Sequence, residues 1–146
     1  MGKQLEVKAE FHTDPCLLAS VRALVRGFAQ SCGVPGERID GIVLGVDEAC
    51  TNVIRHAYAG ATDQRFWVTL RNDDEGLEVE LLDLGEPAPP DCYTQRPLAP
   101  RGPGSLPVGG LGVHLVNQVF DEVEFVPGTE RGNRIRLRVY ATAASS

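Results

Sequence analysis

Two polar residues at helical spacing are the first candidates for chemistry in this chain of 146 residues. Glu48 and Asn52 lie four positions apart within a run of apolar residues at helical spacing, so their side chains would share one face of a helix. Gly41, Gly45 and His56 fall along nearly the same line, and a glycine inside a helix costs about 1 kcal/mol relative to alanine. This combination indicates that something approaches the face closely. On this helix alone, ordinary exposed polar residues beside incidental glycines are an equally open interpretation.

Two later segments carry residues suited to a flat ligand and to an anion. Asp83 ends an alternating strand and Gly85 follows it, so a carboxylate could accept a hydrogen bond from an exocyclic amine while the backbone approaches the ligand. Residues 109–112 (Gly-Gly-Leu-Gly) open a predicted helix, where backbone N–H groups and the helix dipole favour an anion. Alone, the first can be an ordinary turn and the second a flexible entry to a helix. The order of all three features along the chain is much harder to obtain by chance.

Periodicity predicts the elements that would position these residues. Alternating apolar residues predict strands at 4–11, 64–71, 77–83, 122–127 and 133–140. Helical spacing predicts a helix from Pro15 to about Ser31 with Thr13 or Asp14 as its cap, a second over 36–57 and a short third over 111–120. Residues 86–108 are rich in Pro, Gly and Ser and too long for an ordinary connection, which is typical of a lid, a binding loop or a disordered segment.

The last four predicted strands share one pattern of charges. Their outward positions carry Glu78, Glu80, Glu122, Glu124, Arg134, Arg136 and Arg138, and apolar residues alternate with them. Opposite charges facing each other across strands suit a solvated sheet face, and the helices would cover the apolar face. We therefore predict a single α/β domain over residues 1–146, a two-layer α/β sandwich with a mainly antiparallel sheet and helices on one face.

Composition excludes some partners and favours one compartment. The net charge is −6, with 20 acidic against 14 basic residues, which argues against a nonspecific grip on nucleic acid or on an anionic membrane. No apolar stretch resembles a signal peptide or a membrane span, so we expect a cytoplasmic protein. The four cysteines lack CxxC spacing and are expected to be reduced thiols, with a zinc site at Cys92 and His114 as the alternative.

Three segments of the chain together resemble a known family. VDEACTNVIRHAY (46–58), LLDLGEP (81–87) and GGLGVHLVNQVFDEVEF (109–125) resemble the N, G1 and G2 boxes of the GHKL ATPases. Within that superfamily they are most similar to the anti-sigma factor serine/threonine-protein kinases. The resemblance covers about residues 5–140 and implies the Bergerat fold, in agreement with the sandwich predicted from alternation.

The resemblance also implies a role for each candidate residue. Asn52 matches the asparagine that coordinates Mg²⁺, and Glu48 matches the general base that would take the proton of a substrate serine or threonine. Asp83 matches the aspartate that reads the adenine amino group, with Gly85 beside it. The remaining matches are His56 at the end of the N box, Gly110, Leu111 and Gly112 near the phosphates, and 86–108 as the ATP lid.

The activity implied by the resemblance is ATP- and Mg²⁺-dependent protein serine/threonine kinase activity. The substrate would be a STAS-type anti-sigma factor antagonist, the second partner a sequestered sigma factor, and the protein a homodimer with no direct contact to nucleic acid or membrane. The runner-up is a regulatory interaction module that binds ATP without phosphotransfer. A plain structural domain, the third interpretation, would show no saturable binding of Mg-ATP.

Overall fold

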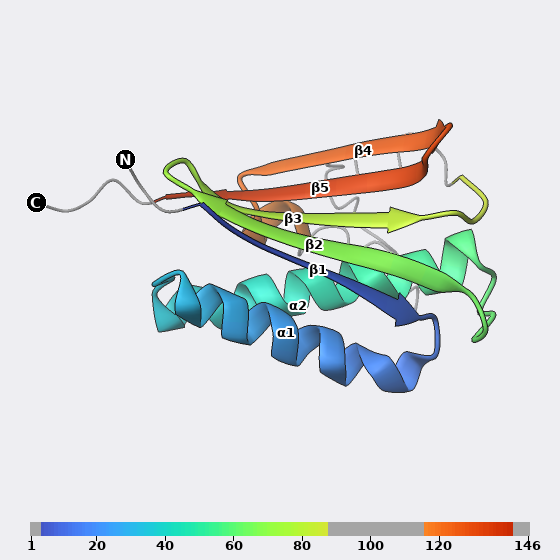
Figure 1. Cartoon of the computed structure of the whole chain (residues 1–146), viewed down its shortest axis with the longest axis horizontal. Coiled ribbons are helices and arrows are strands. Elements are labelled where there is room, and N and C mark those ends of the chain that lie inside the picture. Colours follow the sequence, from blue (N-terminus) through green and yellow to red (C-terminus); the bar gives the residue numbers. More distant parts are fainter. Residues whose placement is uncertain (1–3, 88–115, 142–146) are drawn as a thin grey trace, which may run out of the picture.

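The computed structural model describes residues 4–87 and 116–141, which form a five-stranded sheet with two long helices packed on one face (Figure 1). The strand order is β1-β2-β3-β5-β4, and every neighbouring pair is antiparallel. The elements are β1 (Leu5–His12), η1 (Pro15–Leu17), α1 (Leu18–Ser31), α2 (Gly36–Asn52), η2 (Val53–Ala57), β2 (Arg65–Asp73), β3 (Gly76–Asp83), β4 (Glu122–Thr129) and β5 (Gly132–Tyr140). The predicted two-layer α/β sandwich is confirmed.

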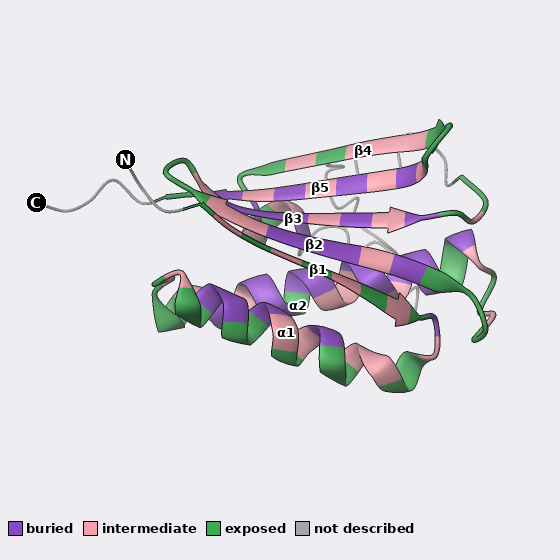
Figure 2. Ribbon diagram, viewed as in Figure 1, coloured by how far each residue is buried: buried purple, intermediate pink, exposed green. Residues whose placement is uncertain are grey.

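The core lies between the sheet and the two helices (Figure 2). Alternate residues of the strands face the helices, as the period of two predicts, and the apolar stripe of each helix faces the sheet. The fully buried side chains of the core include Val21, Val25, Ile42, Val46, Phe66, Val68, Leu70, Val79, Leu81, Val116, Ile135 and Leu137. Because residues from every layer meet in this cluster, the helices are held at a fixed place above the sheet.

Two of the three predicted helices differ from the structure at one end each. The first begins with a 3₁₀ turn, η1, whose cap is Asp14: its carboxylate accepts a hydrogen bond from the N–H of Cys16 at 3.0 Å. The second, expected as one helix to Ala57, is α-helical only to Asn52 and ends in a π-helical turn, η2. π-Helical turns are rare in proteins, and those that occur often lie at functional sites. This turn falls on the end of the predicted N box.

The glycines of α2 mark a face that is closely approached, as expected, and the chain itself supplies the contact. A Cβ atom at Gly45 would lie 2.7 Å from the ring of Phe120, and one at Gly41 would lie 3.5 Å from Val119. Residues 116–119 are helical and are the described end of the predicted third helix. The close approach to this face of α2 is therefore made by another part of the chain, and these glycines give no support for a ligand there.

The outer face of the sheet carries the predicted charge pattern. Glu78 faces Arg71 on β2 and Arg138 on β5, and it forms ion pairs with both and with Arg136 at 2.8–3.0 Å. Burial alone would raise the pKa of Glu78, but hydrogen bonds from the three guanidinium groups outweigh it and hold the pKa at about 2. The prediction of opposed charges is confirmed, although Glu78 is buried beneath its partners rather than solvated.

Several predictions fall on residues 88–115, outside the described ones. These are most of the 86–108 lid and the residues Cys92, Gly110, Leu111, Gly112 and His114. In the described part of the chain, Cys16, Cys32 and Cys50 are free thiols, as expected. None of the helices in that part has the length and hydropathy needed to cross a membrane.

Candidate functional site

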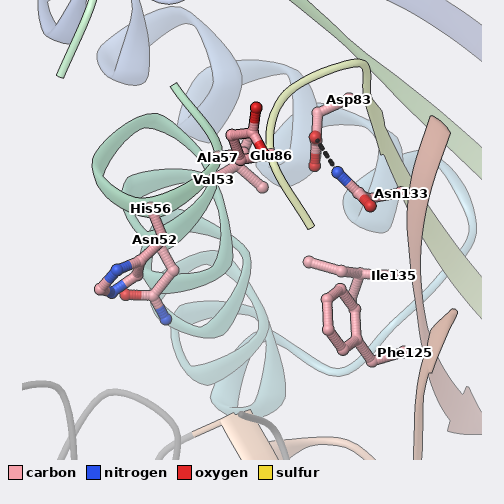
Figure 3. Close-up of a pocket in the computed structure, with 9 residues that line it drawn as sticks. All are labelled: Asn52, Val53, His56, Ala57, Asp83, Glu86, Phe125, Asn133 and Ile135. Atoms are coloured by element: carbon pink, nitrogen blue, oxygen red, sulfur yellow. Dashed lines mark hydrogen bonds between the residues drawn. The ribbon is translucent and has the colours of Figure 1, made fainter. Parts of the chain in front are cut away.

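A cavity lies between the end of the second helix and the ends of β3, β4 and β5 (Figure 3). It is open to solvent and brings together three of the predicted site residues: Asn52, His56 and Asp83. Glu48 does not line it. The other lining residues are Val53, Ala57, Glu86, Phe125, Asn133 and Ile135. The cavity joins the predicted N box and G1 box, which are far apart in sequence.

Asp83 supplies the buried carboxylate of the cavity. It is the last residue of β3, and only 3% of its surface is exposed. Its Oδ1 accepts hydrogen bonds from Asn133 Nδ2 at 2.7 Å and from the N–H of Gly85 at 3.0 Å. Burial raises the pKa of Asp83, and these two hydrogen bonds oppose the rise. Among the described residues, both hydrogen bonds to Asp83 are accepted by Oδ1 and none by Oδ2.

Asn133 is a site residue that the sequence analysis missed. Only 2% of it is exposed, and its Nδ2 donates to Asp83 Oδ1 and, at 3.0 Å, to the carbonyl oxygen of Gly85. Its Oδ1 accepts from the N–H of Gly128 at 2.8 Å. Because donors and acceptor are all engaged, the amide holds the carboxylate in one orientation. The available signal was register, since Asn133 and Asp83 face each other where β5 begins and β3 ends.

Gly85, which follows Asp83 by two residues, lies against the end of the helix. A Cβ atom at this position would overlap the carbonyl oxygen of Ala57 in η2. The same carbonyl accepts a hydrogen bond from the N–H of Glu86 at 2.8 Å. The turn after Asp83 is thereby fastened to the end of the helix, and only glycine leaves room for that contact.

Asn52 and His56 form the helical wall of the cavity. Their side chains lie side by side in Figure 3, and they differ in exposure: His56 is exposed, whereas Asn52 is 4% exposed. Asn52 is therefore a buried polar side chain at the wall of the cavity. Across from the helix, Ile135 and Phe125 extend from β5 and β4 and form an apolar wall that suits the face of a flat ring (Figure 3).

The described residues of the site include the amide of Asn52 but no cluster of ionic metal ligands. Among residues 4–87 and 116–141, no three His, Cys, Asp or Glu side chains are close enough together to hold an ion. An amide oxygen such as that of Asn52 is a suitable ligand for Mg²⁺, which usually keeps several waters and takes further ligands from phosphates. The donor set therefore fits an ion that arrives with a phosphate-bearing ligand.

Comparisons with known proteins agree with this geometry. The family described as Histidine kinase-like ATPase domain matches residues 11–139. "Serine-protein kinase RsbW" of Bacillus velezensis is 30% identical over 122 residues, which cover 81% of this chain and 76% of that protein. "Serine-protein kinase RsbW" of Halalkalibacterium halodurans is 34% identical over 110 residues, 71% of this chain and 65% of that protein.

A solved structure shows the same fold. It is the histidine kinase domain from the Erythrobacter litoralis EL346 blue-light activated histidine kinase, with a TM-score of 0.50 and 19% identity. The match covers 88% of this chain and 61% of that one. The family match spans most of the chain, in agreement with the GHKL resemblance of the three boxes. The chain therefore belongs to the histidine kinase-like ATPase domain family.

Proposed function

We propose that this chain is an ATP- and Mg²⁺-dependent serine-protein kinase of the anti-sigma factor type. The observation that carries the proposal is the oriented carboxylate of Asp83, which lines one cavity together with Asn52 and His56. Membership of an ATPase domain family and relatives named serine-protein kinase support the activity.

The nucleobase end of the site would be read by Asp83. Its Oδ2 would accept a hydrogen bond from the exocyclic amine of adenine, while Ile135 and Phe125 contact the face of the ring. A purine with a carbonyl oxygen in place of the amine would set two acceptors against each other, which is strongly disfavoured in a buried site. The geometry thus favours ATP over its 6-oxo analogues.

The phosphate end of the site would lie toward Asn52 and Glu48. Asn52 would give its amide oxygen to Mg²⁺, and the bound ion would offset phosphate charge. Glu48, one helical turn earlier, would accept the proton of a serine hydroxyl as the general base. We further assign phosphate contacts to His56, Gly110, Leu111 and Gly112, with 86–108 as the lid.

Substrate and partners are proposed from the same relationship. The substrate would be a serine or threonine of a STAS-type anti-sigma factor antagonist, and the chain would also sequester a sigma factor. The named activity of the two relatives supports serine as the acceptor. Homodimerisation and a cytoplasmic location stay predictions.

Phosphotransfer tests this proposal directly. Wild-type protein, γ-labelled ATP, Mg²⁺ and a candidate antagonist should give labelled antagonist, and Glu48→Gln should lower the rate by at least about a hundredfold. Glu37→Gln is the matched control, because Glu37 lies in the first turn of the same helix and outside the cavity. Calorimetry with Mg-ATP should show saturable binding by all three proteins.

Glu48, the proposed general base, does not line the cavity, and this favours a second candidate function: a module that binds ATP but transfers no phosphate. Saturable ATP binding without transfer to any antagonist would identify a nucleotide-dependent interaction module instead. Absence of saturable Mg-ATP binding would overturn both functions.

A further inference from the structure

Tyr58 joins three elements next to the cavity through a single hydroxyl. It follows η2 directly, and its ring packs against the core. The hydroxyl oxygen accepts a hydrogen bond from the N–H of Leu84 at 2.8 Å, and the hydroxyl donates to the carbonyl oxygen of Arg65 at 2.6 Å. One phenol therefore ties the end of the helix to the start of β2 and to the turn that follows Asp83.

The register of the sheet shows which backbone groups this hydroxyl engages. Phe66 faces Asp83, so the next opposing pair in the antiparallel ladder would be Arg65 and Leu84. On the other side of β2, the carbonyl of Gln64 accepts a hydrogen bond from the N–H of Thr13 at 2.9 Å. Successive carbonyls of a strand point to opposite sides, so the carbonyl of Arg65 points toward β3. The next hydrogen bond of the ladder would thus run directly from the N–H of Leu84 to the carbonyl oxygen of Arg65.

The Tyr58 hydroxyl stands between these two groups and takes both bonds. The ladder between β2 and β3 consequently ends at Asp83 instead of continuing by one rung. The chain leaves the sheet at Leu84 and turns toward the helix, where Gly85 fits against Ala57. With a direct rung, β3 would run on along the sheet, and the backbone of Gly85 would be drawn away from the helix.

We propose that Tyr58 is a positioning residue for nucleobase recognition: its hydroxyl ends the β2–β3 ladder and thereby fixes the Asp83 carboxylate at the cavity. The inference rests on the proposed ATP site and adds a residue that does not line the cavity. Asp83 Oδ1 takes its second hydrogen bond from the N–H of Gly85, in the turn that Tyr58 sets. A shift of this turn would loosen the carboxylate without removing it.

Nucleotide discrimination tests this role. ITP differs from ATP by a carbonyl oxygen in place of the 6-amino group, so the ratio of the two affinities reports how well Asp83 is placed. Tyr58→Phe keeps the ring, and it should lower the ATP-to-ITP affinity ratio by roughly tenfold relative to wild type. Tyr140→Phe is the matched control, because Tyr140 is 45% exposed and lies at the opposite end of the sheet, facing Gly76. It should leave the ratio unchanged.

Backbone hydrogen exchange supplies a second measurement that needs no variant. The Leu84 amide of the wild-type protein should be protected, because it donates a hydrogen bond to the Tyr58 hydroxyl. If Tyr58→Phe fails to fold, protection of Leu84 in the wild type still supports the inference, and free exchange there overturns it.

The two proposals fail in different ways. A folded Tyr58→Phe variant with the wild-type ATP-to-ITP ratio would overturn the role of Tyr58 and leave the ATP site intact. A wild-type protein that binds neither nucleotide would overturn the proposed function and this inference with it.

Discussion

Asp83 holds its carboxylate in surroundings that disfavour the charged form. Burial raises its pKa, and the hydrogen bonds from Asn133 and Gly85 offset only part of that effect. A carboxyl group whose pKa is higher in the folded than in the unfolded state destabilises the fold once the pH exceeds both values. The charge at this position therefore lowers the stability of the fold at neutral pH, as groups retained for ligand recognition often do.

Asp83→Asn should separate recognition from stability. The amide is nearly isosteric and carries no charge, so the free energy of unfolding at pH 7 should stay equal or rise. Its Nδ2 would replace Oδ2 and face the amine of adenine as a second donor, so ATP affinity should fall by at least about a hundredfold. Urea unfolding and calorimetry measure the two quantities. A loss of stability together with the loss of ATP affinity would show that Asp83 acts mainly in folding.

Site residues that belong to a sequence motif were predicted, whereas the residues that hold them in position were not. Asn52, His56 and Asp83 were grouped from spacing and resemblance, and they share one cavity. Asn133 and Tyr58 were missed, because their roles depend on register and on the distance between a helix end and a strand end. Neither quantity follows from local periodicity.

The long helix α2 shows how far periodicity defines an element. Its apolar stripe identified the helix and its buried face over 36–57, yet the change to a π-helical turn at Val53 was not visible. A single wide turn shifts the spacing of apolar residues too little to be distinguished from an α-helical one. The glycines were recognised as sites of close approach, but the contacting partner, Phe120, lies far along the chain.

Alanine substitution at two helical glycines should have opposite effects on stability. Gly27 in α1 has open space where a Cβ would lie, so Gly27→Ala should raise the free energy of unfolding by about 0.5–1 kcal/mol. A Cβ at Gly45 would lie 2.7 Å from the Phe120 ring, so Gly45→Ala should lower it by about 1–3 kcal/mol. Chemical denaturation of both variants checks the pair. Stabilisation by Gly45→Ala would show that Phe120 moves aside freely.

In the described part of the chain, helices cover one face of the sheet (Figure 2), and charged side chains form ion pairs on the other face. Glu78 lies at the centre of this outer face, 7% exposed, with three arginines from β2 and β5 around it. Ion pairs on exposed surfaces contribute little, but a shielded carboxylate with several guanidinium donors keeps much more of its interaction energy. The strands of the open face are thus joined by side chains as well as by backbone hydrogen bonds.

Acid sensitivity should report this cluster. The pKa of Glu78 is lowered from 4.5 to about 2, so its ionised form stabilises the fold above pH 4.5 and that contribution is lost as the pH falls toward 2. The loss amounts to at most about 3 kcal/mol. Glu78→Gln should therefore be less stable than wild type at pH 7, and the gap should close as the pH approaches 2. Urea unfolding followed by Trp67 fluorescence measures it.

Glu124→Gln is the control for this titration, because Glu124 is exposed and pairs with Arg136 at 3.5 Å from outside the cluster. Its stability should stay within about 0.5 kcal/mol of wild type at every pH. A gap between Glu78→Gln and wild type that persists at pH 2 would mean that packing of the side chain matters and not its charge. An equal gap in Glu124→Gln would attribute the effect to the general charge of the sheet face.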